Sequence, residues 1–91
     1  MVTIFKALAD KTRVNIIKLI ARDPGICGCE IAAKFKTTQG TISHHIRILV
    51  EAKLIIDTKE GRSHYYTLNV TAFEHINKFV DSLAILDKVQ N

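Results

Sequence analysis

The sequence predicts a mostly helical α+β domain, and three features of its 91 residues support this prediction. Two short amphipathic segments joined by a polar turn occupy the stretch from Cys29 to Leu54. A pattern typical of a β hairpin follows directly, and helical apolar stripes lie near both ends of the chain. Hydrophobic residues make up 47% of the sequence, which is ample for one packed core, so we expect a single domain spanning residues 1–91.

The N-terminal part of the chain predicts two helices. The first is expected over Val2 to Ala9, and the second follows Asp10, whose carboxylate suits an N-cap. The second helix should end near Arg22, because Asp23-Pro24-Gly25 combines the fixed φ of proline with the positive φ that glycine tolerates. Its cations are candidates either for phosphate contacts or for a solvated face, and they are Lys11, Arg13 and Lys18.

The stretch from Cys29 to Leu54 predicts a helix-turn-helix. Apolar residues fall on one face of each segment, namely Ile31, Ala32 and Phe35 in the first and Ile42, Ile46 and Leu49 in the second. Between the segments, Lys36-Thr37-Thr38 supplies a break, and Thr37 or Thr38 can cap the second helix. The alternative is an ordinary amphipathic helical hairpin whose polar face is only solvated. The elements that flank this stretch discriminate between the two interpretations.

The outward face of the second segment carries side chains that can pair with DNA. Glutamine can pair with adenine, arginine with guanine, and threonine or serine with bases or phosphates. A recognition helix presents its N-terminal end to the base edges, and a glycine there lets the backbone approach closely. The predicted DNA-facing residues of this helix are Thr38, Gln39, Gly40, Thr41, Ser43, His44 and Arg47.

A β hairpin is predicted immediately after this unit. Residues 55–58 form the first strand, 59–62 the turn and 63–68 the returning strand. The turn places Lys59 and Arg62 beside Gly61, where both cations can contact a DNA backbone or enter a minor groove, although hairpin tips are often simply polar. A helix-turn-helix over about 29–52 followed at once by a basic hairpin over about 55–68 predicts a winged helix-turn-helix.

The last segment, over about 70–86, predicts a helix with more apolar surface than one small core needs. Together with the apolar edge of the helix at 2–9, this surface predicts a symmetric homodimer interface. Two-fold symmetry would set two recognition helices about 34–36 Å apart and imply a palindromic operator in double-stranded DNA. The predicted interface residues are Ile4, Phe5, Leu8, Phe73, Ile76, Val80 and Leu83.

Bulk properties favour a nucleic-acid partner. The formal net charge is +4 and the pI is near 9.3, which suits a polyanion. No apolar run approaches the roughly 20 residues of a membrane span, and no signal-peptide pattern begins the chain. We therefore expect a cytoplasmic protein without membrane insertion, whose two cysteines are mostly reduced.

An enzyme is not expected from this sequence. It has no glycine-rich phosphate loop and no nucleophile with an ordered base, and its Cys-Gly-Cys lacks the strand-turn-helix setting of thiol oxidoreductases. The remaining alternative is a winged helix that binds protein or RNA. Such a module would bind duplex DNA weakly and without steep salt dependence.

The order of these elements, with four strings, resembles the ArsR/SmtB family of small dimeric winged-helix transcriptional repressors. The strings are FKALADKTRVNIIKLI, CEIAAKF, TTQGTISHHIRILVEAKLI and EGRSHYYTLN, which together run from about Phe5 to Asn69. The resemblance implies an autoregulated repressor that leaves DNA when an inducer binds. It also implies DNA-facing positions for Gln39, Thr41, Ser43 and His44, a packed structural role for His45, and the wing cation at Arg62. Lys11 departs from the proline with which the family usually starts this helix.

The identity of the inducer depends on the role of Cys27 and Cys29. The resemblance makes them candidate metal ligands, because many metal-responsive members of the family carry a Cys-x-Cys pair at this position. Cys27 falls at an N-cap position, with Glu30 three residues on, where serine or threonine would cap better. A poor capping residue in that position indicates another use. The helix N-terminus would also favour the thiolate that binds soft metals or reacts with oxidants.

Two thiolates alone form an incomplete metal site. Zinc takes four ligands and arsenite or antimonite typically three sulfurs, and the sequence offers only His64 and His75 as further unassigned imidazoles. Three interpretations stay open: a site for a thiophilic metal or metalloid completed by an external thiol or partner residue, a disulfide redox switch, and two structural cysteines. In the third case no inducer ion binds here, and a sequestering protein could supply the signal. No cofactor is required in any of them.

Overall fold

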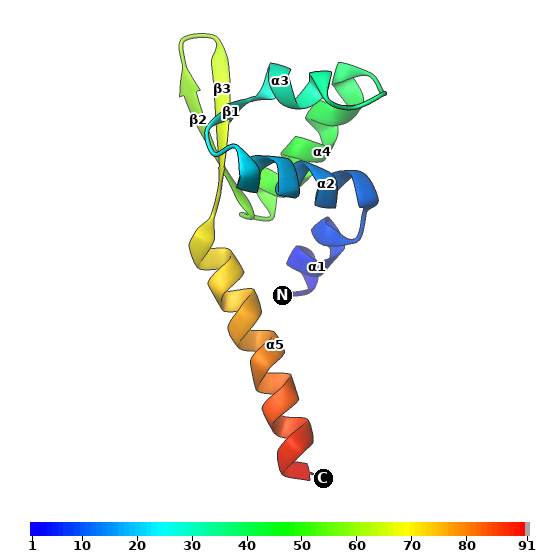
Figure 1. The fold of residues 1–91 in the computed structure, drawn as a ribbon, viewed down its shortest axis with the longest axis vertical. Helices are drawn as coiled ribbons and strands as arrows, with labels where there is room; N and C mark the ends of the chain where they lie inside the picture. The colour runs from blue at the N-terminus through cyan, green and yellow to red at the C-terminus, as the bar shows by residue number, and fades with distance from the viewer. Residues whose placement is uncertain (91) are drawn as a thin grey trace.

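The computed structural model describes residues 1–90 as five helices and a small sheet (Figure 1). The helices are α1 (Val2–Leu8), α2 (Lys11–Arg22), α3 (Gly28–Ala33), α4 (Gln39–Glu51) and α5 (Val70–Gln90). The strands are β1 (Ile26–Cys27), β2 (Ile55–Glu60) and β3 (Ser63–Leu68). This mostly helical architecture with a β hairpin after α4 is the winged helix-turn-helix that the sequence predicts.

The core lies where α2, α3, α4 and the sheet meet. Six large side chains there are almost completely inaccessible to solvent: Ile16, Ile20, Ile31, Ile42, Leu49 and Leu54. Burying each such side chain stabilises the fold by roughly 1.5–3 kcal/mol. Because α4 contacts α2 and α3 through its apolar face, its opposite face remains exposed to solvent.

The start of α2 is fixed by Asp10, as predicted. Its carboxylate Oδ1 accepts the backbone N–H of Arg13 at 3.1 Å. This hydrogen bond is the main reason that the pKa of Asp10 lies below its ordinary value. The negative charge at the N-terminus of α2 also interacts favourably with the helix dipole.

The guanidinium of Arg13 makes internal hydrogen bonds, so its interpretation as a phosphate contact is wrong. Its Nε donates to the carbonyl of Ala7 at 2.6 Å and its Nη2 to the carbonyl of Lys6 at 3.3 Å. Its Nη1 lies 3.2 Å from Nδ1 of His45 on α4. Arg13 thus joins the end of α1 to α2 and α4, and this pairing confirms a packed structural role for His45.

The sheet has three antiparallel strands in the order β1-β3-β2, and the sequence did not predict β1. This strand has only two residues, and its register pairs Ile26 with Tyr66. The preceding Gly25 has a φ of +86° and donates its N–H to the carbonyl of Tyr66 at 2.9 Å. The turn after α2 therefore brings the start of α3 against the wing.

Several element boundaries differ from the prediction. The helix expected over 2–9 ends at Leu8, and α3 ends at Ala33, so Phe35 packs against the core from the following turn instead of from a helix. Strand β2 continues through Lys59 and Glu60, which shortens the wing turn to Gly61 and Arg62. Helix α5 runs past the expected end near residue 86 to Gln90.

Helix α5 extends away from the body of the domain and makes one dimension of the molecule 53 Å long (Figure 1). Its first half contacts the core through partly buried Phe73 and Ile76. Further along, Phe79 lies beside Phe5 of α1, with ring centroids 6.0 Å apart. Within residues 1–90, none of the helices combines the length and the apolar character that crossing a membrane requires.

Candidate nucleic-acid interface

Helix α4 begins with a threonine cap. Oγ1 of Thr38 accepts the backbone N–H of Thr41 at 3.1 Å, and the two hydroxyl oxygens lie 2.8 Å apart. Of the two predicted capping residues, the structure selects Thr38. Both threonines are exposed, so their hydroxyls organise the helix start while they remain accessible to an external partner.

The residues predicted to face DNA lie together on the solvent side of α4. All of them are exposed, whereas Ile42, Ile46 and Leu49 of the same helix are buried. This separation follows from the helical period, because residues three or four positions apart share a face. The exposed set is Thr38, Gln39, Gly40, Thr41, Ser43, His44 and Arg47.

The two predicted wing cations occupy different positions in the hairpin. Arg62 lies in the turn beside Gly61, whose φ is +62°, and it is exposed. Lys59, expected in the turn, lies instead inside β2 opposite His64 of β3. Arg62 is therefore the cation at the tip, whereas Lys59 is an exposed side chain of the strand.

A side-chain hydrogen bond crosses the hairpin near Lys59. Nδ1 of His64 lies 2.7 Å from Oδ1 and 3.0 Å from Oδ2 of Asp57. The sequence alone indicates no partner for His64, because strand alternation and cross-strand register are needed to bring it beside Asp57. The imidazole also stacks on the ring of Tyr66, with centroids 6.5 Å apart.

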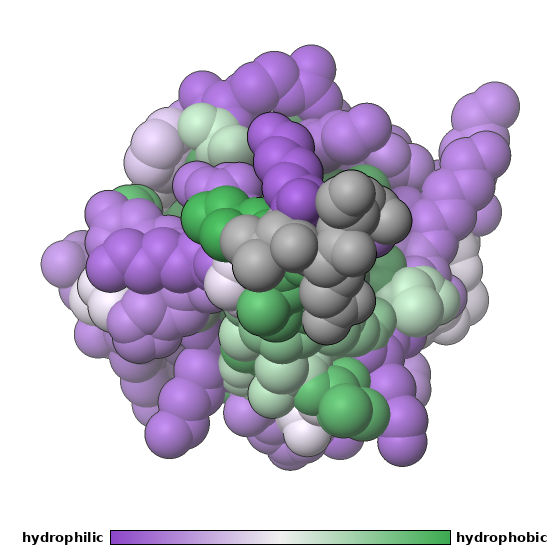
Figure 2. Space-filling model, turned by 90° about the horizontal axis from the view of Figure 1, so that it is seen from below, coloured by the Kyte–Doolittle hydropathy of each residue, from purple (hydrophilic) through white to green (hydrophobic). Residues whose placement is uncertain are grey.

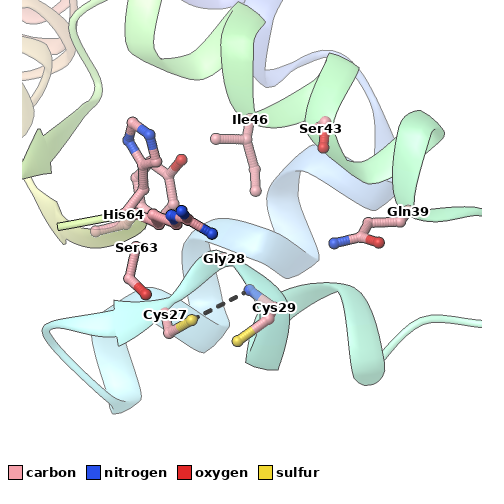
Figure 3. A pocket seen from close by; sticks show the side chains of 10 residues that line it. Cys27, Gly28, Cys29, Gln39, Ser43, Ile46, Ser63 and His64 are labelled. Atoms are coloured by element: carbon pink, nitrogen blue, oxygen red, sulfur yellow. Dashed lines mark hydrogen bonds between the residues drawn. The ribbon is translucent and has the colours of Figure 1, made fainter. Parts of the chain in front are cut away.

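A hollow of about 280 Å³ lies between α4 and the wing, and the cysteine pair borders it. Figure 3 shows Gln39, Ser43 and Ile46 pointing from α4 toward the space that Cys27 and Cys29 border from the opposite side. The wing closes the third side. The lining residues are Cys27, Gly28, Cys29, Gln39, Ser43, Ile46, Arg62, Ser63, His64 and Tyr66.

The two cysteines are free thiols at the start of α3. Sγ of Cys27 accepts the backbone N–H of Cys29 at 3.3 Å, so Cys27 is the N-cap, as expected (Figure 3). Hydrogen bonds from the Cys29 thiol and then from its backbone lower the pKa of Cys27. The same thiol–thiol hydrogen bond raises the pKa of Cys29, which makes Cys27 the better candidate thiolate.

In the described part of the chain, no third side chain completes a metal site with this pair. Among residues 1–90, no group of three or more histidine, cysteine, aspartate or glutamate side chains is arranged to hold a metal ion. His64 borders the same hollow, but its Nδ1 pairs with Asp57, and His75 lies far along the chain on α5. The described residues therefore offer the two thiols no completed ligand set.

Comparisons with known proteins identify the family to which the chain belongs. The family model described as "Bacterial regulatory protein, arsR family" matches residues 10–57, which include α2, the helix-turn-helix and the start of the wing. The chain belongs to the arsR family. This result confirms the family that the sequence motifs indicated.

Relatives of this arsR-family chain cover most of its length. An uncharacterized HTH-type transcriptional regulator of Methanocaldococcus jannaschii is 41% identical over 80 residues, which are 88% of this chain and 90% of the relative. The arsenical resistance operon repressor of Staphylococcus xylosus is 34% identical over 86 residues, 94% of this chain and 82% of the relative.

A solved structure shares the fold. The homodimeric winged helix-turn-helix DNA-binding domain of a possible ArsR-family transcriptional regulator from Mycobacterium bovis has a TM-score of 0.73 and 24% identity. The comparison covers 91% of this chain and 76% of the other. It supports the winged-helix architecture of this arsR-family member.

The predicted dimer residues of this arsR-family chain divide into two groups. Four of them, Ile4, Leu8, Phe73 and Ile76, are partly buried against the monomer's own core. Phe5, Val80 and Leu83 remain more exposed, with Val80 and Leu83 each 49% accessible. Figure 2 shows apolar side chains gathered at the α5 end of the molecule and bordered by hydrophilic ones. Other exposed apolar residues lie at the N-terminus, Met1 and Val2, and near the end of α5, Ile85 and Leu86.

Proposed function

We propose that this arsR-family DNA-binding repressor acts as a homodimer on a palindromic operator. Each protomer inserts the N-terminal end of α4 into a major groove and places Arg62 against the neighbouring backbone or minor groove. The observation that carries the proposal is the exposure of all seven predicted DNA-facing residues between Thr38 and Arg47, of which Gln39 and Ser43 line one hollow with Arg62 of the wing. The proposed regulation involves no catalytic step. Because its partner is DNA, the proposed location of the protein is the cytoplasm.

The dimer is proposed from the apolar surface of α1 and α5. Large hydrophobic side chains left half exposed on a small domain lose contact with water when a second copy covers them. Phe5, Val80 and Leu83 form the centre of the proposed interface. The other four predicted interface residues pack beneath this centre, between it and the core of the monomer, where they are already partly buried: Ile4, Leu8, Phe73 and Ile76.

The proposed inducer acts at Cys27 and Cys29. One relative carries the name arsenical resistance operon repressor, and both thiols border the hollow next to α4. An arsenite, antimonite or other thiophilic metal species would need further ligands, from an external thiol or from a partner residue. Oxidation of the two thiols to a disulfide is the second candidate signal, and it needs no third ligand.

The proposal is tested by fluorescence anisotropy of labelled duplexes selected from a randomised pool by the reduced protein. We expect affinity to fall by at least about a hundredfold between roughly 50 and 200 mM salt, because phosphate contacts release counterions. Weak binding to every duplex without salt dependence would instead favour a protein- or RNA-binding module.

The inducer is tested on the same complexes with arsenite, antimonite, zinc, cadmium and a mild oxidant. An agent that releases the wild type and spares a Cys27→Ser/Cys29→Ser variant identifies the inducer class. Equal responses of the two proteins, or no response, would assign the cysteines a structural role and leave a repressor without metal sensing.

A further inference from the structure

The cysteine pair lies inside the surface proposed to bind DNA. Cys27 and Cys29 line the same 280 Å³ hollow as Gln39 and Ser43 of α4 and Arg62 of the wing (Figure 3). A separate regulatory site would require a conformational relay to α4. Here the thiols and the DNA-facing side chains border one space, so no relay is needed.

The chemistry of this hollow suits a phosphodiester. Its lining includes the cation Arg62 and the hydrogen-bonding side chains Gln39, Ser43, Ser63 and His64, and it contains no carboxylate among the described residues. Arginine, serine and glutamine side chains are common phosphate contacts in protein–DNA complexes. A helix in a major groove and a wing directed toward the adjacent minor groove are separated by one sugar–phosphate strand, which must pass between them.

We propose that the hollow seats this strand, so that the DNA backbone and any group attached to Cys27 or Cys29 exclude each other directly. The volume of the hollow is close to that of the smallest small-molecule sites, roughly 300 Å³. It therefore has room for a DNA phosphate group or for a group attached to a thiol, but not for both. This inference rests on the proposed DNA binding but on no particular inducer. By linkage, DNA must weaken a thiol ligand by the same factor by which the ligand weakens DNA.

A Cys27→Ser variant separates occlusion from damage to the helix cap. Serine is a better N-cap than cysteine, so α3 keeps its start, and Cys29 becomes the single thiol of the chain. Cys29 is exposed, and iodoacetamide alkylates it when the thiolate displaces iodide and a sulfur–carbon bond forms. A matched control carries Cys27→Ser, Cys29→Ser and Asn15→Cys, which moves the thiol to an exposed position on α2 outside the hollow.

The experiment measures the alkylation rate by mass spectrometry with and without a duplex selected by the wild type. With the duplex at about ten times its Kd, Cys29 should react about tenfold more slowly, because only free protein exposes the thiol. The control thiol at position 15 should react at one rate in both conditions. In the reverse direction, the carbamidomethylated Cys27→Ser protein should bind the duplex at least about tenfold more weakly, with unchanged helical circular dichroism.

The outcomes separate this inference from the proposed function. Suppose that the anisotropy assay shows bound duplex but the alkylation rate of Cys29 is unchanged, or that Cys29 and the control thiol at position 15 are slowed equally. Either result would overturn the inference that DNA occupies the hollow and would leave the proposed DNA binding intact. Full DNA affinity of the alkylated protein would overturn it as well. Failure of the unmodified wild type and of Cys27→Ser to bind any selected duplex would overturn the proposed function, and the inference with it.

Discussion

The two ends of the molecule expose opposite kinds of surface. At the α4 end, exposed polar side chains such as Thr38 and Thr41 already satisfy part of their hydrogen bonding within the monomer. At the α5 end, Val80 and Leu83 are half exposed with no polar atoms to offer water. In one protomer the proposed DNA-facing surface is polar and suited to solvent, whereas the terminal helices expose apolar surface that a second copy would cover.

The largest expected effect comes from placing charge in the apolar end. A Val80→Asp/Leu83→Asp variant should be monomeric at micromolar concentration in analytical ultracentrifugation, because two carboxylates cannot be buried unpaired. Its DNA affinity should fall by about a hundredfold or more, since the two half-sites are no longer bound together. Lys78→Asp, which changes the net charge by the same two units at an exposed position of α5 that is not three or four residues from any predicted interface residue, serves as the control. A dimeric double variant would remove Val80 and Leu83 from the interface.

An effect of about 1–3 kcal/mol is expected at the α4 end when Gln39→Ala removes a base contact. Specificity should relax at one base pair per half-site, which sequencing of duplexes selected by the variant would show. If the variant selects the same sequences with the same affinity as the wild type, Gln39 does not contact a base.

The wing should act without sequence preference. Arg62→Ala should weaken binding to all duplexes and lower the salt slope of the dimer by about two, because each of its two protomers loses one phosphate contact. Lys59→Ala should change the slope less, since Lys59 lies within β2 and not in the turn. Equal slopes for the wild type and Arg62→Ala would exclude Arg62 from the phosphate contacts.

The stability of α2 should depend on pH through Asp10. Its pKa is lowered in the folded state, so the carboxylate stabilises the fold above the ordinary pKa of aspartate. This contribution is lost as the pH falls below about 4 toward the folded-state value. In urea unfolding, Asp10→Ser should keep a cap but lose this part of the pH dependence. Asp10→Ala should lose about 1 kcal/mol at neutral pH.

The smallest effect is expected at the start of α3. Cys27→Ser should raise the free energy of unfolding by a few tenths of a kcal/mol, roughly, because an oxygen acceptor caps better than sulfur. Urea denaturation of the reduced wild type and the variant would measure it. A destabilised variant would show that the Cys27 thiol makes packing contacts that serine cannot replace.

The elements with a strong local period could be predicted from the sequence. Ile42, Ile46 and Leu49 repeat at spacings of four and three, and this period predicts correctly which face of α4 is buried and which is exposed. Asp10 is a cap whose chemistry is local, so it too could be identified in advance, whereas the cap of α4 could be narrowed only to Thr37 or Thr38.

The remaining features depend on contacts between distant parts of the chain. Strand β1 has two residues, which is too short to show alternation, and it forms only because Ile26 meets Tyr66. Lys59 and Glu60 have low strand propensity, yet pairing with β3 extends β2 through them. The internal role of Arg13 and the closeness of the cysteines to α4 likewise arise only after folding.

The most direct test of the proposed function is the sequence of the duplexes that the reduced protein selects from a randomised pool. A symmetric pair of α4 helices predicts two inverted half-sites with centres about 10–10.5 base pairs apart, or a multiple of one helical turn. Both half-sites should carry the base pair whose preference Gln39→Ala relaxes. A single asymmetric site, or no enrichment of any sequence, would contradict a dimeric winged helix that reads a palindromic operator.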